Sequence, residues 1–296
     1  MGIAAAIMFG SSHFFNGVLS RRVPAMNIAV CSQLGGAFLF GGWTLARFDG
    51  GPSGQDLFWA AVSGVGAGLG VAALYEGMRR CRISVVVPVT SIVSVALPFL
   101  ASVIILGDRI ETPLALAALL LVPATWLLSR PASASHTKDT SPVVTPPERS
   151  PQETSANNAV AVALGLVAGL GYATQLFALS RISSPEPAAP MLVSQIVSVI
   201  PLVLLLYYRS GRWLPAGGGA TLSKAAGVGG LAALAMVSYL YATREVALAP
   251  VMIAIALYPA LPVILALVVL KERLSTPQIG GLGIAAIVLP LINLTG

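Results

Sequence analysis

The fold follows from two matching stretches of sequence, Gly-Asp-Arg-Ile-Glu-Thr-Pro at residues 107–113 and Lys-Glu-Arg-Leu-Ser-Thr-Pro at residues 271–277. Leu-Pro at 97–98 and again at 261–262 stands ahead of the two copies at the same offset of 164 residues, which also relates Tyr75 to Tyr239. Two further matches follow in the same order, Ser32-Gln33 with Ser194-Gln195 at an offset of 162 and Leu19-Ser20-Arg21 with Leu179-Ser180-Arg181 at an offset of 160. Two small gaps align all of them, so the two halves of the chain are copies.

The composition places both halves in a membrane. Hydrophobic residues make up 56% of the 296 residues and charged residues 9%, and the mean hydropathy is +0.86. A soluble domain carries about 25% charged residues, so a soluble globule this poor in charge could not cover its surface. The net charge of +6 comes from Lys and Arg residues scattered between apolar runs. Lys and Arg residues scattered in this way are typical of the loops that set the orientation of membrane spans. They do not form the basic face of a nucleic-acid-binding protein.

Ten apolar stretches are long enough, or nearly so, to cross a bilayer as helices, which takes about 20 residues. They are Gly2–Leu19, Asn27–Ala46, Leu57–Met78, Ile83–Leu106, Pro113–Leu128, Ala159–Leu179, Ala188–Tyr208, Leu222–Thr243, Ala249–Leu270 and Gln278–Leu294, of which the fifth and tenth are short. We therefore predict an all-α integral membrane protein with ten transmembrane helices. Because five spans per copy is an odd number, the second copy enters the membrane from the opposite side, which predicts two inverted five-helix repeats.

A polar segment separates the two repeats. Residues 130–158 contain five prolines among many Ser and Thr residues and almost no large apolar side chain, which predicts a disordered linker. The domains are then residues 1–129, the first repeat, and residues 159–296, the second. The side of the membrane that holds the linker receives 13 Lys and Arg residues and the other side 4. The positive-inside rule thus places the linker in the cytoplasm and both termini outside.

Three short motifs accompany this organisation. They are Phe9-Gly10-Ser11-Ser12 in the first span and the turns Gly107-Asp108-Arg109-Ile110 and Lys271-Glu272-Arg273-Leu274. They are similar to the Trp-Gly-Ser-Ser start and the Gly-Glu-Arg-Leu turn of the EamA-type, ten-helix transporters of the drug/metabolite transporter (DMT) superfamily. The resemblance implies a carrier in a bacterial inner membrane, often an exporter of amino acids or related metabolites. It also implies that spans one, three, four, six, eight and nine line a central cavity.

The spans contain very few ionisable groups. All 11 Asp and Glu residues lie in loops, in the linker or at span ends, and Glu76 and Glu245 come nearest to the bilayer. Carboxylate-driven proton exchange is therefore not expected, because ionisable groups that serve it lie at membrane depth. His13 can titrate near neutral pH, so His13 and Glu76 are the two candidate proton sites. The middle of every span also lacks Lys and Arg, which argues against a sugar-phosphate substrate.

Neutral polar side chains gather in the spans that the resemblance places around the cavity. The candidate substrate-binding residues are Ser12, His13, Asn16, Tyr75, Ser91, Ser94, Tyr172, Gln175, Tyr239 and Tyr258. Helical spacing puts Ser12 and Asn16 on one face and Tyr172 and Gln175 on another. Hydroxyl, amide and aromatic groups suit an uncharged or zwitterionic solute. Each group also has a structural alternative, a hydrogen bond to its own helix or to a neighbouring one.

Other residues in the spans are assigned to packing or bending. Gln33 and Gln195 match each other in the repeat, and we expect them to form interhelical hydrogen bonds. A glycine series in the third span predicts close helix approach, and prolines in spans four, seven and nine predict kinks. These residues are Gly64, Gly66, Gly68, Gly70, Pro88, Pro98, Pro201, Pro259 and Pro262.

Together these patterns favour a secondary transporter that moves small metabolites, in particular amino acids or similar neutral or zwitterionic solutes, by alternating access. A membrane channel or a structural membrane protein is the alternative. An enzyme is not expected, because the spans hold no paired carboxylates, no metal-ligand cluster and no activated nucleophile. We expect no cofactor and no metal. The expected partners are a small solute and the lipid bilayer, and the choice between monomer and homodimer stays open.

Overall fold

The structure, a computed structural model, describes residues 1–47, 51–81, 83–129, 151–271 and 274–293, and all regular structure in them is helical. Eight segments are long and apolar enough to span a membrane. They comprise α1 (Gly2–Leu19), α2 (Ala25–Ala46), α3 (Gly54–Arg80), α4 (Ile83–Ala101) with a π-helix (Ser102–Leu106), α6 (Pro151–Ser180), α7 (Ala188–Ser210), α8 (Gly219–Glu245), and α9 (Leu248–Ile255) with α10 (Ala260–Val269). The predicted fifth and tenth spans are the shorter apolar helices α5 (Thr112–Leu128) and α11 (Thr276–Asn293). The prediction of an all-helical membrane protein is confirmed for the described residues.

The linker prediction needs one correction. Residues 130–150 lie outside the described residues, but helix α6 begins at Pro151, so the last eight residues assigned to a disordered linker, 151–158, are helical. Proline is well placed in a first helical turn, where its missing N–H has no partner to lose. Three of the seven residues that follow it up to Asn158, a glutamine, a glutamate and an alanine, are good helix formers. Polar composition alone concealed this extension.

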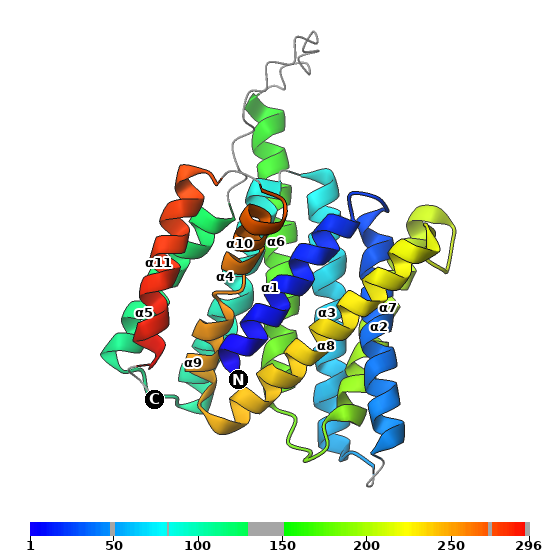
Figure 1. Cartoon of the computed structure of the whole chain (residues 1–296), viewed down its shortest axis with the longest axis horizontal. Coiled ribbons are helices and arrows are strands. Elements are labelled where there is room, and N and C mark those ends of the chain that lie inside the picture. The colour runs from blue at the N-terminus through cyan, green and yellow to red at the C-terminus, as the bar shows by residue number, and fades with distance from the viewer. Residues whose placement is uncertain (48–50, 82, 130–150, 272–273, 294–296) are drawn as a thin grey trace.

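The helices form a bundle in which the closest neighbours come from opposite halves of the sequence (Figure 1). Helix α3 packs on α6 and α7, α4 on α6, α1 and α2 on α8, and α5 on α11. Helices α5 and α11 lie together at one flank, and α2 and α7 at the other. We call the end where α1 and α3 finish and α6 begins the upper end, and the opposite end the lower end, as Figure 1 shows them.

The glycine series of α3 lies at two of these contacts, as its spacing predicts. A Cβ atom at Gly66 would lie 2.6 Å from the carbonyl oxygen of Gly171 on α6, and one at Gly68 would lie 2.5 Å from the carbonyl oxygen of Ser198 on α7. Both distances are too short for a side chain, so α3 touches its two neighbours backbone to backbone. Close packing of this kind drives helix association in membranes.

Prolines break one span but leave others continuous. The ninth span is interrupted at residues 256–259, between α9 and α10. Pro259 and Pro262 have no N–H to donate to the carbonyls of Ile255 and Tyr258. Those two carbonyls instead accept hydrogen bonds from residues three positions ahead, from the N–H of Tyr258 at 2.9 Å and the N–H of Leu261 at 3.2 Å. Helices α4 and α7 run on through their prolines, although α4 passes into the π-helix shortly after Pro98.

Candidate functional site: a central polar cavity

A cavity of about 440 Å³ lies between the helices. Its inner lining comes from the middle of helices, at Phe9, Ser94 and Met236, and from the break in the ninth span. Its lining reaches the upper end of the bundle, at Ser20 after α1 and Ser129 after α5. The cavity therefore connects the centre of the bundle with its upper end.

Nine of the ten candidate substrate-binding residues line this cavity. They are Ser12, His13 and Asn16 of α1, Tyr75 of α3, Ser91 and Ser94 of α4, Tyr172 and Gln175 of α6, and Tyr258 at the break between α9 and α10. The cavity thus gathers hydroxyl, amide, imidazole and phenol groups from five spans. Within the described part of the chain, the lining includes no Asp, Glu, Lys or Arg.

His13, Tyr258 and Ser91 lie close together in the cavity. The ring centroids of His13 and Tyr258 are 5.3 Å apart, and the Tyr258 hydroxyl lies 3.3 Å from the Ser91 hydroxyl. Gly10 makes this possible, because a Cβ atom there would lie 2.7 Å from the Tyr258 carbonyl oxygen. One turn before His13, the glycine lets α1 approach the backbone of the broken span. His13 is nevertheless exposed, since its ring opens on the cavity.

The two repeat-matched glutamines also line the cavity, which the sequence argument did not expect. Gln33 donates from Nε2 to the Ser198 hydroxyl at 2.9 Å, so the expected interhelical bond joins α2 and α7. Gln195 is buried and lies near Met236, with 3.9 Å between Nε2 and Sδ. The match between the two glutamines in the repeat was the one feature of the sequence that singled them out. Their place beside the cavity depends on helix rotation, which a repeat offset does not give.

Asn16 approaches α2 from the first helix. Its Nδ2 lies 3.3 Å from the Ser32 hydroxyl, while its Oδ1 is buried without a hydrogen-bond partner. An unpaired buried acceptor costs free energy. Asn16 therefore has hydrogen-bonding capacity left for a solute or for water.

The structure places Tyr239 away from the cavity lining. Its side chain is completely buried in the hydrophobic core, and its hydroxyl donates to the Leu176 carbonyl at 2.9 Å. Tyr75, its counterpart in the repeat, lines the cavity. Tyr239 therefore ties α8 to α6, which is the structural alternative considered for every polar residue in the spans.

Glu76, one of the two candidate proton sites, also lies outside the cavity lining. It is near the upper end of α3, where Arg79 donates to its carboxylate at 3.1 Å and Arg80 and Arg209 form further ion pairs with it. Arg209 belongs to α7, so this cluster joins α3 to α7. Three cations thus engage this carboxylate outside the cavity, and His13 is the candidate inside it.

Carboxylates at the lower end join the two halves of the chain. Asp56, buried at the start of α3, accepts a hydrogen bond from the N–H of Ser183 at 2.7 Å, in the loop between α6 and α7. Asp108, after the π-helix, accepts from the N–H of Ala249 at 3.0 Å, in the first turn of α9. These bonds hold together the end of the bundle opposite to the cavity opening. Sequence reasoning missed both, because the partners are more than a hundred residues apart.

The fold and the cavity define a class: a multi-pass α-helical membrane protein built around a polar but uncharged central cavity. The model of the EamA-like transporter family matches residues 147–294, half of the chain. The chain belongs to this family, which is part of the DMT superfamily. Family membership indicates a transporter of the drug/metabolite type, and the family is one of transporters rather than enzymes.

The overall architecture also occurs among solved structures. One of them, titled "Crystal structure of protein", superposes with a TM-score of 0.72 over 99% of each chain at 13% sequence identity. This likeness shows that the fold is shared and says nothing about the solute. No curated protein matches the sequence.

Proposed function

We propose that the protein is a secondary transporter for small zwitterionic solutes of the amino-acid type. The observation that carries the proposal is the cavity lining, in which polar side chains from five spans gather without a formal charge. A charged solute would leave its charge unpaired in a site of low dielectric constant, which is costly. A zwitterion has no net charge and offers donors and acceptors to Tyr172, Gln175 and the Ser91–Tyr258 pair.

The break in the ninth span supports a zwitterion over a simple neutral solute. Helix α9 ends at Ile255 and α10 begins at Ala260, and both Ile255 and Pro259 line the cavity. A helix carries partial negative charge at its C-terminus and partial positive charge at its N-terminus. Transporters use the ends of such half-helices to bind charged groups. The dipole at the end of α9 favours an ammonium group. The dipole at the start of α10 favours a carboxylate, although the N–H groups of Ala260 and Leu261 already donate to Leu257 and Tyr258.

We further propose that the solute crosses by alternating access between two inverted five-helix repeats, with α5 and α11 as the fifth span of each. Support comes from the helix contacts: two helices that pack together have counterparts in the other repeat that also pack together. Helix α3 packs on α6 and α7, and its counterpart α8 packs on α1 and α2. In the described conformation the lining reaches the upper end, while the bonds of Asp56 and Asp108 close the lower end.

The charges support an orientation with the upper end in the cytoplasm of a bacterial cell. Arg79, Arg80 and Arg209 lie at this end, and so does the start of α6, to which residues 130–150 lead. Under the positive-inside rule the linker is then cytoplasmic and the cavity faces the cytoplasm. A cavity that loads from the cytoplasm fits export.

The test is uptake by purified protein in liposomes, with three radiolabelled compounds of nearly equal shape. Leucine is zwitterionic, leucinamide is a cation and N-acetyl-leucine is an anion at neutral pH. We expect saturable uptake of leucine or of another zwitterion in a wider amino-acid panel, and no uptake of its two charged analogues. Gln175→Leu, which keeps the size of the side chain, should weaken uptake. Preference for a charged analogue, or steady conductance in a planar bilayer, would contradict the proposal.

A further inference from the structure

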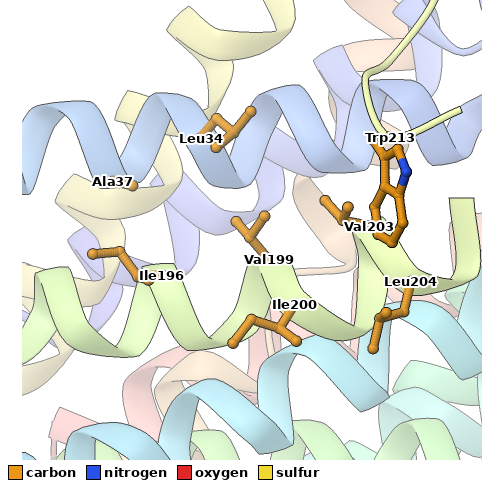
Figure 2. Close-up of a pocket in the computed structure, with 8 residues that line it drawn as sticks. All are labelled: Leu34, Ala37, Ile196, Val199, Ile200, Val203, Leu204 and Trp213. Carbon is orange, nitrogen blue, oxygen red and sulfur yellow. The ribbon is translucent and has the colours of Figure 1, made fainter. Parts of the chain in front are cut away.

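A second hollow, which we call the lipid groove, lies on the outer surface between α2 and α7 (Figure 2). It has a volume of about 350 Å³ and is lined by Leu34 and Ala37 of α2, by a row on α7 that runs from Ile196 to Leu204, and by Trp213. Ile196, Ile200 and Leu204 are each half exposed, although they belong to a span. In a bilayer these side chains face the hydrocarbon, so whatever fills the groove is apolar.

The groove runs along one half of the membrane. From Ile196 to Leu204 it follows nine residues of helix, whose eight steps rise by about 12 Å. Half of a bilayer's hydrocarbon core is about 15 Å. Figure 2 shows Trp213 at one end of this row, beside Val203 and Leu204, and Ile196 at the other. The groove thus extends from the middle of α7 to its upper end, as an acyl chain of one leaflet does.

The upper end of the groove has the residues of a membrane–water interface. Trp213 stacks on Tyr207, with ring centroids 4.1 Å apart and an angle of 16° between the planes. Tryptophan and tyrosine are enriched at the level of lipid headgroups. Arg212 precedes Trp213 and is exposed; within the part of the chain that the structure describes, no ion pair engages it, whereas Arg209 pairs with Glu76. A cation at this level attracts an anionic headgroup.

We propose that the lipid groove binds one anionic phospholipid, with an acyl chain along α7, Trp213 at the headgroup level and Arg212 facing the phosphate. A second copy of the chain fits the lining less well. Helices that associate in membranes do so through small residues, and among the eight lining residues Ala37 is the only small one. The groove lies on the outer side of α2 and α7, which reach the cavity through Gln33 and Gln195, and the inference does not depend on the proposed solute.

The test is quenching of tryptophan fluorescence by lipids brominated on the acyl chain, added to the purified full-length protein. The chain has four tryptophans, so Trp213→Phe identifies the share of the quenching that comes from the groove. We expect this share to saturate at a mole fraction of brominated phosphatidylglycerol about fivefold lower than for brominated phosphatidylcholine. Arg212→Gln should abolish this preference, since one interfacial cation supplies about that factor.

Ala37→Phe fills the groove and should remove the saturable share. Leu119→Phe, on an exposed position of α5 outside the groove, is the matched control and should keep it. Quenching that rises linearly with either lipid, and equally in both variants, would overturn the proposal in favour of unspecific lipid contact. A dimer in mass photometry that Ala37→Phe dissociates, without any lipid preference, would overturn it in favour of a second copy.

Discussion

The hydroxyl groups of Ser91 and Tyr258 lie 3.3 Å apart and join helix α4 to the break in the ninth span. The repeat offset of 164 pairs these two spans, with Tyr258 opposite Ser94. The bond therefore lies where the two halves of the chain meet in the cavity. A solute that hydrogen-bonds to both hydroxyls would contact both halves of the chain at once. Its binding would then depend on the relative position of the two halves.

Tyr258→Phe removes this hydroxyl and leaves the ring beside His13. We expect the KM for the transported solute to rise about fivefold, the equivalent of one neutral hydrogen bond worth ~1 kcal/mol. The protein should fold normally. Initial rates of uptake into proteoliposomes measure the change, and Tyr241→Phe on α8, whose ring lies under the Arg244 guanidinium, serves as the control. An unchanged KM would remove Tyr258 from the binding site.

His13→Gln tests the remaining candidate proton site. Glutamine keeps donor and acceptor groups but cannot titrate, so transport by an uncoupled carrier should survive the change. We expect uptake to be indifferent to an imposed pH gradient in both proteins, and His13→Ala to lose about fivefold in rate through lost contacts. Uptake that follows the gradient in the unaltered protein and ignores it in His13→Gln would instead establish proton exchange at His13.

Asp108→Ala removes the acceptor for the N–H of Ala249 at the lower end. A charge-assisted hydrogen bond is worth about 1.5–3 kcal/mol, so its loss should shift the population toward conformations open at that end. The measurement is labelling by a membrane-impermeant maleimide, applied from the lower side to a cysteine at position 94 in a variant that lacks Cys31 and Cys81. We expect labelling about tenfold faster than in the parent.

The control for this experiment is Glu111→Ala, an exposed carboxylate close to Asp108 in the sequence. It removes the same charge without touching α9 and should leave the labelling rate as it is. Equal rates in the two variants would show that the Asp108 bond does not hold the lower end closed.

Gly66→Ala places a methyl group against the Gly171 carbonyl, where no space exists. Overpacking typically costs about 1–3 kcal/mol. A clash with backbone belongs at the upper end of this range, because no side chain can move aside. Denaturant titration in detergent should show the loss. Gly42→Ala in α2, where a Cβ meets nothing within 4 Å, should gain up to ~1 kcal/mol from helix propensity. Equal free energies of unfolding for Gly66→Ala and Gly42→Ala would show that α3 and α6 are not in backbone contact at Gly66.

Much of the fold could be predicted from the sequence, because a membrane span has a length and a composition that can be counted. The resemblance to the EamA-type transporters placed the spans of Ser12, Asn16, Tyr172 and Gln175 around one cavity, while the helical period and the repeat offset indicated only which of these residues share a face or match each other. The same offset misplaced Tyr239. An offset fixes a position along a helix but not the helix rotation, and Tyr239 turns toward Leu176 rather than to the cavity.

Contacts between distant loops had no signal in the sequence. The bond between Asp56 and Ser183 joins residues 127 positions apart, and nothing near either of them indicates the other. The extension of α6 to Pro151 was missed for a different reason. Composition measures whether a segment can bury itself in a core, while a helix that is already formed in the membrane can be extended outward by one hydrogen bond per added residue.

The break at residues 256–259 has a consequence for the kinetics of the cycle. Its counterpart around Ser94 lies in an unbroken helix, so in the alternating-access cycle that we propose the two directions of travel are not expected to be mirror images of each other. We expect one resting orientation to be lower in free energy and the return of the empty carrier to be slower in one direction than in the other. Without an energy source such a carrier cannot accumulate its solute. We expect it to show unequal KM values for entry and exit, balanced by unequal maximal rates so that their ratios agree.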